Sequence, residues 1–182
     1  MNNITRIPDN LYAKISELLK KAQRDVIKVV NRAMVYTYFE IGKMIVEEEQ
    51  KGRERADYGS QLIAELSLRL SNEFGKGFSS TNVKQMRSFY LIYSKGQTPP
   101  DEFNLSWSHY LKLMRINETQ ERQFYEIEAQ KNTWSIKELQ RQYDSALYFR
   151  LALSRDKKKV MELSEKGLVI ENPIFTNPSI LG

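Results

Sequence analysis

The feature that most constrains the fold is a long stretch of apolar residues at helical spacing near the start of the chain. These residues recur at steps of three and four from Leu11 to Ile45, and no proline interrupts them. The spacing predicts one face of an α-helix that Asp9 or Asn10 caps. A helix of about 40 residues would be about 60 Å long, which is more than a small domain can cover. We therefore expect it either to bend near residues 31–37 or to pack in part on another chain.

The residues that follow have the outline of a helix-turn-helix motif. A second helix is predicted from Tyr58 to Phe74, and it leads into a turn that contains Gly75 and Gly77. Ser79 or Ser80 can cap the next helix, which has an apolar face and an opposite polar face. Helix, glycine turn and polar-faced helix are typical of a nucleic-acid reader, although ordinary core packing gives the same outline.

The polar face of this last helix supplies the candidate DNA contacts. We expect Lys76 and Lys84 to bind phosphates and Gln85 to contact a base edge. Arg87 can do either. The predicted contacts are Lys76, Thr81, Lys84, Gln85, Arg87 and Ser88.

The rest of the chain also favours helices. Ser106 is a predicted cap, and Ser135 with a glutamate three residues later forms a capping-box pattern. A last short helix is predicted over residues 156–165, with lysines 157–159 as further phosphate contacts. No hairpin signal is present, so we expect an all-α fold, a multi-helix domain with a long N-terminal helix and a helix-turn-helix-like core. The apolar stripe after Ser135 is Ile136, Leu139, Tyr143 and Leu147.

Composition limits the chemistry that these residues can perform. The 182 residues carry a net charge of +5, which permits an acidic partner, and they include no cysteine and one histidine. His109 lies between aromatic residues and is interpreted as structural, and the consecutive Glu47, Glu48 and Glu49 are interpreted as a solvated face. Neither a phosphate-binding loop nor a nucleophile elbow occurs. We therefore predict no catalytic residue, no metal site and no cofactor.

The sequence contains no apolar run of membrane-spanning length and no signal-peptide pattern near its first residue. We therefore expect a cytoplasmic protein without a membrane partner.

Several blocks of sequence, taken in order, resemble one family. They are Y-F-E-I-G-K-M-I (38–45), A-D-Y-G-S-Q-L-I-A-E-L-S (56–67), G-K-G-F-S-S-T-N-V-K-Q-M-R-S-F-Y (75–90), L-S-W-S-H-Y (105–110), R-Q-F-Y (122–125), W-S-I-K-E-L-Q-R-Q (134–142) and N-P-S-I-L-G (177–182). Together these blocks resemble the N-terminal domain of the YhcG-like proteins, a domain of unknown function. The glycine, aromatic and capping residues in the blocks also have structural reasons to be there.

In that family the helical domain is joined to a C-terminal nuclease domain of the PD-(D/E)XK type. The resemblance implies a helical N-terminal domain at residues 1–166 and a linker at residues 167–182 toward a nuclease domain that this sequence does not include. The metal-binding acidic residues and lysine of such a nuclease are not present, so we expect no nuclease activity from this chain.

Two functions stay open. The chain is either a non-catalytic module that binds DNA and targets its own C-terminal nuclease domain, or a protein-interaction or homo-oligomerisation module that uses the long first helix without direct DNA contact.

Overall fold

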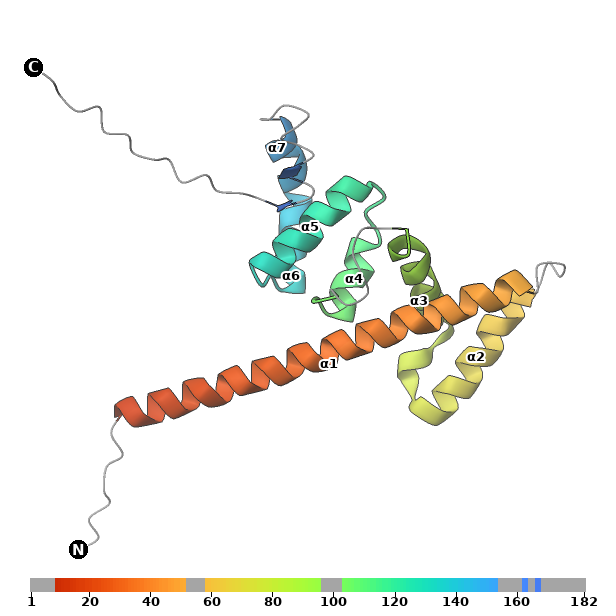
Figure 1. The fold of residues 1–182 in the computed structure, drawn as a ribbon, viewed down its shortest axis with the longest axis horizontal. Coiled ribbons are helices and arrows are strands. Elements are labelled where there is room, and N and C mark those ends of the chain that lie inside the picture. The colour runs from red at the N-terminus through yellow and green to blue at the C-terminus, as the bar shows by residue number, and fades with distance from the viewer. Residues whose placement is uncertain (1–8, 52–57, 96–102, 154–161, 164–165, 168–182) are drawn as a thin grey trace, which may run out of the picture. The chain divides into compact units, whose positions relative to one another are not determined.

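The computed structural model describes residues 9–51, 58–95, 103–153, 162–163 and 166–167 (Figure 1). The chain divides into two compact units, residues 1–115 and residues 116–182. No strand occurs in the described ranges, and the predicted all-α class with a long first helix is confirmed. Unit 1 contains α1 (Asp9–Lys51), α2 (Tyr58–Phe74), the 3₁₀ turn η1 (Lys76–Phe78), α3 (Ser80–Tyr93) and α4 (Trp107–Leu113). Unit 2 contains α5 (Thr119–Lys131), α6 (Ile136–Asp144) and α7 (Leu147–Leu153).

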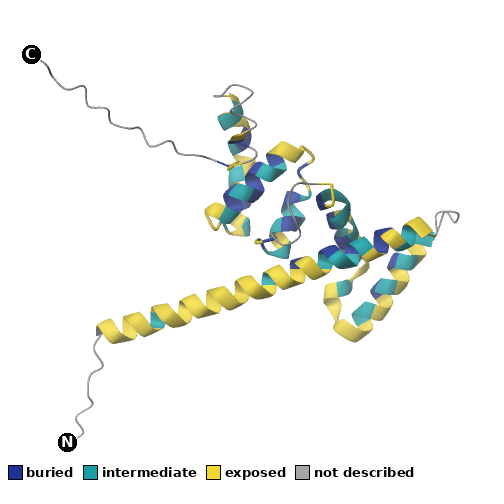
Figure 2. Cartoon of the chain, viewed as in Figure 1, coloured by how far each residue is buried: buried dark blue, intermediate teal, exposed yellow. Residues whose placement is uncertain are grey.

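Helix α1 is a single α-helix of 43 residues, and Figure 1 shows it as a straight rod without the bend that one of our two alternatives expected. Its two halves have different surroundings. The second half is buried in unit 1, where Val35, Phe39 and Ile45 are at most 6% exposed. The side chains of residues 10–34 are exposed, except for the half-buried Ser16 and Asn31 (Figure 2).

The core of unit 1 forms where α3 packs along the second half of α1. The two helices approach closely at Gly42, where an added Cβ atom would lie 2.1 Å from the backbone oxygen of Met86. Beside this crossing, the ring centroid of Phe89 lies 5.0 Å from that of Phe103 and 5.1 Å from that of Tyr110. Such aromatic contacts contribute beyond the area that they bury.

Helix α2 joins this core through a smaller apolar cluster. Ile63 packs with Ile45 of α1 and Val83 of α3, and Phe78 of the turn packs against them. On the apolar side of α2, Ile63 is buried, and the leucines beside it, Leu62, Leu66 and Leu70, are half-buried.

Unit 2 is organised around Tyr125 of α5, which is fully buried. Its hydroxyl donates to the backbone oxygen of Gln142 at 3.3 Å and accepts from the backbone N–H of Tyr148 at 3.2 Å. The second bond satisfies an amide in the first turn of α7, which has no partner within that helix. One side chain therefore holds α5, α6 and α7 together.

The predicted apolar stripe from Ile136 to Leu147 is wrong as a single helical face. Helix α6 ends at Asp144, Ala146 adopts a positive φ of 51°, and α7 begins at Leu147. Tyr143 is consequently 40% exposed. The break lets Tyr125 bond the start of a separate helix. Most of the predicted helix 156–165, with its three lysines, lies outside the described residues, as does the predicted linker after residue 167.

Candidate nucleic-acid interface

The polar face of α3 is accessible. Thr81, Lys84 and Ser88 are exposed along the helix, and Lys76 is exposed in the turn before it. Gln85 is half-buried at the edge of this face. In the part of the chain that the structure describes, neither lysine forms an ion pair. We call the exposed set of Lys76, Thr81, Lys84 and Ser88 the α3 face.

Arg87 differs from the other candidates because it is bound within the fold. Its Nε lies 2.6 Å from Oε2 of Glu49, and the two side chains are 35% and 17% exposed. The guanidinium therefore ties α3 to α1. The structure does not place Arg87 with the free cations of the α3 face.

The interpretation of the three consecutive glutamates as a solvated face is correct for Glu47, holds in part for Glu48, whose side chain is 43% exposed, and is wrong for Glu49. Glu49 binds Arg87, and Glu48 accepts from the hydroxyl of Tyr58 at 3.0 Å and pairs with Lys51 at 3.2 Å. Hydrogen bonds from Lys51 and Tyr58 lower the pKa of Glu48. Helical geometry explains the difference, because consecutive residues point in different directions and two of the three face neighbouring elements.

The turn before α3 is fixed by a set of side-chain hydrogen bonds. Ser67 of α2 donates to the backbone oxygen of Phe78 at 3.0 Å, and Trp107 of α4 donates to Oδ1 of Asn82 at 3.0 Å. Nδ2 of Asn82 donates in turn to the backbone oxygen of Gly77. These bonds hold the exposed lysine of η1 at a set position relative to α3.

Local signals predicted part of this arrangement. Ser79 caps α3 by accepting from the backbone N–H of Asn82 at 3.3 Å, as one of the two proposed caps. The backbone of Gly75 has a φ of 89°, a left-handed conformation that favours glycine, whereas the φ of Gly77 lies outside this region. The hydrogen bond between Asn82 and Trp107 was not predicted from the sequence, although both residues lie in the blocks that carry the family resemblance.

Other residues in those blocks also have structural roles. Ser106 occupies the N-cap position of α4, but its side chain makes no capping bond to a backbone N–H of the helix. Its Oγ lies instead 2.7 Å from Nδ1 of His109. The interpretation of His109 as structural agrees with this contact. Tyr110 is fully buried.

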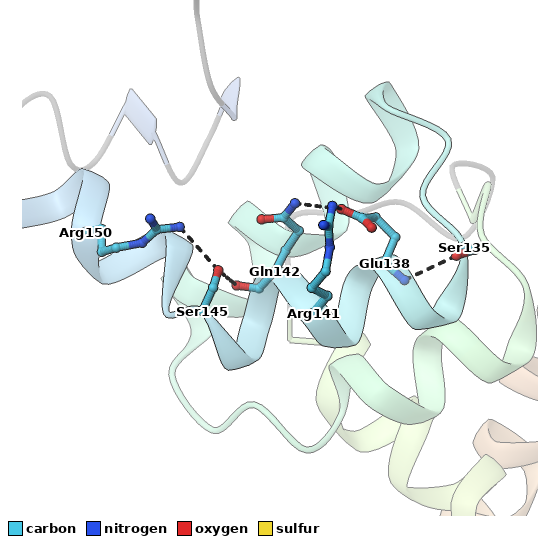
Figure 3. Close-up of polar contacts among 6 residues, drawn as sticks. All are labelled: Ser135, Glu138, Arg141, Gln142, Ser145 and Arg150. Atoms are coloured by element: carbon cyan, nitrogen blue, oxygen red, sulfur yellow. Dashed lines mark hydrogen bonds and ion pairs between the residues drawn. The ribbon is translucent and has the colours of Figure 1, made fainter.

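A second polar cluster lies along α6 and α7 (Figure 3). The serine half of the predicted capping box is confirmed, since the backbone N–H of Glu138 donates to Ser135 Oγ at 3.2 Å. Oε1 of Glu138 accepts from Arg141 and from Gln142, each at 2.6 Å, and these two bonds lower the pKa of Glu138. Arg141 is therefore paired within α6, unlike the lysines of the α3 face.

Among the described residues, no group of three or more His, Cys, Asp or Glu side chains is arranged to hold a metal ion. None of the described helices has the length and hydropathy required for a membrane span.

Comparisons with known proteins place these features in a family. The model of the DUF1016 N-terminal domain matches residues 14–150. A protein of Escherichia coli (strain K12) named "Putative nuclease YhcG" is 35% identical in an alignment of 182 positions that covers 84% of this chain and 48% of that protein. The chain thus spans about half the length of the relative that it matches. No solved structure matches the chain.

Proposed function

The chain belongs to the family of the DUF1016 N-terminal domain, and from this premise we propose that it is a DNA-binding module that targets a nuclease. The observation that carries the proposal is the exposed α3 face, where Lys84 on the helix and Lys76 in the fixed turn before it form no ion pair with any described residue. A positioned polar helix that follows a short turn suits the major groove of DNA.

The relative provides the nuclease part of the proposal. Its name describes a nuclease, and this chain matches 48% of its length. We propose that residues 1–166 correspond to the helical domain of such a protein, that residues 167–182 lead toward its nuclease domain, and that the assembly acts in the cytoplasm. In this proposal the chain itself does not cut DNA.

The side chains of the α3 face have distinct roles in the proposal. Lys76 and Lys84 bind phosphates, because both ammonium groups reach solvent and phosphate contacts supply most of the affinity of such modules. The hydroxyl groups of Thr81 and Ser88 donate hydrogen bonds to the phosphate backbone of the DNA. Gln85, at the edge of the face, is the candidate for a base contact.

Arg87 has a smaller role than the sequence suggests. Its Nε is bound to Glu49, so part of its donor capacity is used within unit 1. A test that removes Arg87 would combine lost DNA contact with altered packing of α1 on α3.

The test is fluorescence anisotropy with labelled duplex and single-stranded DNA at several salt concentrations. We compare Lys76→Ala/Lys84→Ala with Lys21→Ala/Lys28→Ala, a control that removes the same charge from exposed positions of α1. The first variant should bind duplex about 10-fold more weakly and lower the salt slope by about 2. The control should retain most of the affinity.

Two results would oppose the proposal. If both variants bind duplex equally well, DNA does not contact the α3 face. If the folded wild-type chain binds neither DNA at low salt, the DNA-targeting function itself is refuted.

A second candidate function is a protein-interaction or self-association module. The observation that favours it is the exposure of large apolar side chains on the first half of α1, among them Leu18 at 66% and Val29 at 69% (Figure 2). Exposed apolar surface of this extent is typical of an interaction site.

A further inference from the structure

The first half of α1, residues 10–34, extends from unit 1 without contact to its core, and we call it the arm (Figure 2). Ten large apolar side chains of the arm are between 38% and 69% exposed. An isolated amphipathic helix gains its stability mainly from packing its apolar face against another element. The arm has such a face but no neighbour to cover it among the described residues.

The apolar residues of the arm form one continuous stripe. Leu18 and Val29 are 11 residues apart, as are Ile15 and Val26. Eleven residues make close to three whole helical turns, so this repeat keeps the stripe almost parallel to the helix axis. At about 100° per residue, the ten exposed apolar side chains fall within about half of the circumference.

The stripe is rotated away from the side of α1 that packs on α3, and only Ile41 and Ile45 of the smaller cluster fall at its edge. On the same helical wheel its centre lies about 175° from the side of α1 that carries Val35, Gly42 and Val46. The α3-facing side of α1 and the arm stripe therefore point in nearly opposite directions. A partner can cover the arm without displacing α3.

The polar side of the arm is also continuous. Lys21 and Lys28 lie on the half of the wheel opposite the stripe, and both are exposed. A partner on the stripe would leave these charges in water, so docking would not require the burial of unpaired cations.

We propose that the partner is a second copy of this chain, whose own arm packs on the stripe in a symmetric helix pair. This inference rests on the second candidate function and names its surface and its occupant. A straight apolar stripe of this length fits another helix with the same pattern. In the described residues the arm is the one exposed helix face of matching length, and a second copy supplies that face through a two-fold axis.

The available area is sufficient for such a pair. With roughly 80–100 Å² of exposed surface for each of the ten side chains, two arms can bury at most about 1,600–2,000 Å² in total, and a standard stable interface buries about 1,200–2,000 Å². The largest apolar patch on a typical monomer is about 300–600 Å². The arm exceeds this on its own.

The experiment is sedimentation equilibrium of the whole chain over about 1–100 μM, the range in which dimers with micromolar dissociation constants are resolved. The wild-type chain should sediment at twice its mass of 21.4 kDa. Leu18→Glu/Val26→Glu places charges on the stripe and should weaken association at least about 100-fold. Lys21→Ala/Lys28→Ala makes the same change in net charge on the opposite side and should remain dimeric.

Both stripe residues are exposed in a single copy and lie outside the core of unit 1, so the variants should keep the near-ultraviolet circular dichroism of the buried aromatic residues in that core. If the glutamates reduce it, Leu18→Gln/Val26→Gln repeats the test with good helix formers. A wild-type chain that is monomeric throughout the range overturns the inference. A dimer that persists in the stripe variants also overturns it, but leaves self-association through another surface as the second candidate function.

Discussion

The contact between α1 and α3 at Gly42 offers the sharpest test of the fold. Gly42 is buried in the middle of α1, where alanine would ordinarily be the better helix former by about 1 kcal/mol. A Cβ atom at this position would lie 2.1 Å from the backbone oxygen of Met86 and 2.8 Å from its carbonyl carbon. Both are backbone atoms, so no change of rotamer can relieve the contact.

The expected magnitude follows from these opposing effects. To accept Gly42→Ala, the two helices must separate by about 1 Å, and overpacking of this kind costs about 1–3 kcal/mol. Since the obstacle is backbone, we expect the upper end of that range. After the gain in helix propensity, the net destabilisation of unit 1 should be about 2 kcal/mol, which lowers its Tm by about 8 °C.

The chain provides its own reporter for this experiment. Of its two tryptophans, Trp107 lies in unit 1 and Trp134 in unit 2. In a Trp134→Phe background, fluorescence during urea unfolding therefore reports unit 1. Gly77→Ala is the matched control, because a Cβ there meets nothing within 4 Å. Equal stability of the two alanine variants would show that α1 and α3 do not approach as closely as described.

Two further predictions concern unit 2. Tyr125→Phe removes the hydroxyl that bonds Gln142 and the start of α7, and it should lower the free energy of unfolding by about 1–2 kcal/mol; urea unfolding in a Trp107→Phe background measures this, and an unchanged midpoint would contradict it. Burial, and then the charge of Glu118, raise the pKa of Glu121 above 4.5. The folded state therefore holds this proton more tightly, so unit 2 should lose stability as pH rises from about 4.5 through the raised pKa. Glu121→Gln should remove this pH-dependent loss of stability. If the wild-type chain and the variant show parallel profiles of unit 2 stability against pH, Glu121 does not cause the loss.

The parts of the fold that depend on local signals could be predicted from the sequence. Helix α2 has the predicted bounds, Tyr58–Phe74. Ser79 and Ser135 occupy the cap positions that were expected of them. Caps and helical periodicity involve residues within four positions of each other, so one sequence contains all the information that they need.

The parts that depend on distant contacts could not be predicted in this way. Arg87 looks like a DNA contact on its own helix, and only its approach to Glu49, 38 residues earlier, shows that it is paired. Gly42 looks like a weak position in a helix until Met86 is placed beside it. In the sequence, the spacing of Tyr143 and Leu147 continues one helical stripe. In the structure α7 is a separate helix, and the hydrogen bond between its first turn and the hydroxyl of Tyr125 joins it to α5, far from α7 in the sequence.

The two proposed surfaces lie on different helices of unit 1, the arm on α1 and the α3 face on η1 and α3, so one chain can use both at once. A pair of chains joined at the arm would carry two α3 faces, and joining two binding modules raises their combined affinity by roughly 10²–10⁴-fold when both engage one partner. Leu18→Gln/Val26→Gln changes neither charge nor any residue of α3. If both proposals hold, this variant should bind a duplex with two adjacent sites at least about 10-fold more weakly than the wild-type chain, and a short single-site duplex about equally well. Equal loss on both duplexes would mean that the arm contacts DNA itself, because a linkage effect requires two sites on one DNA.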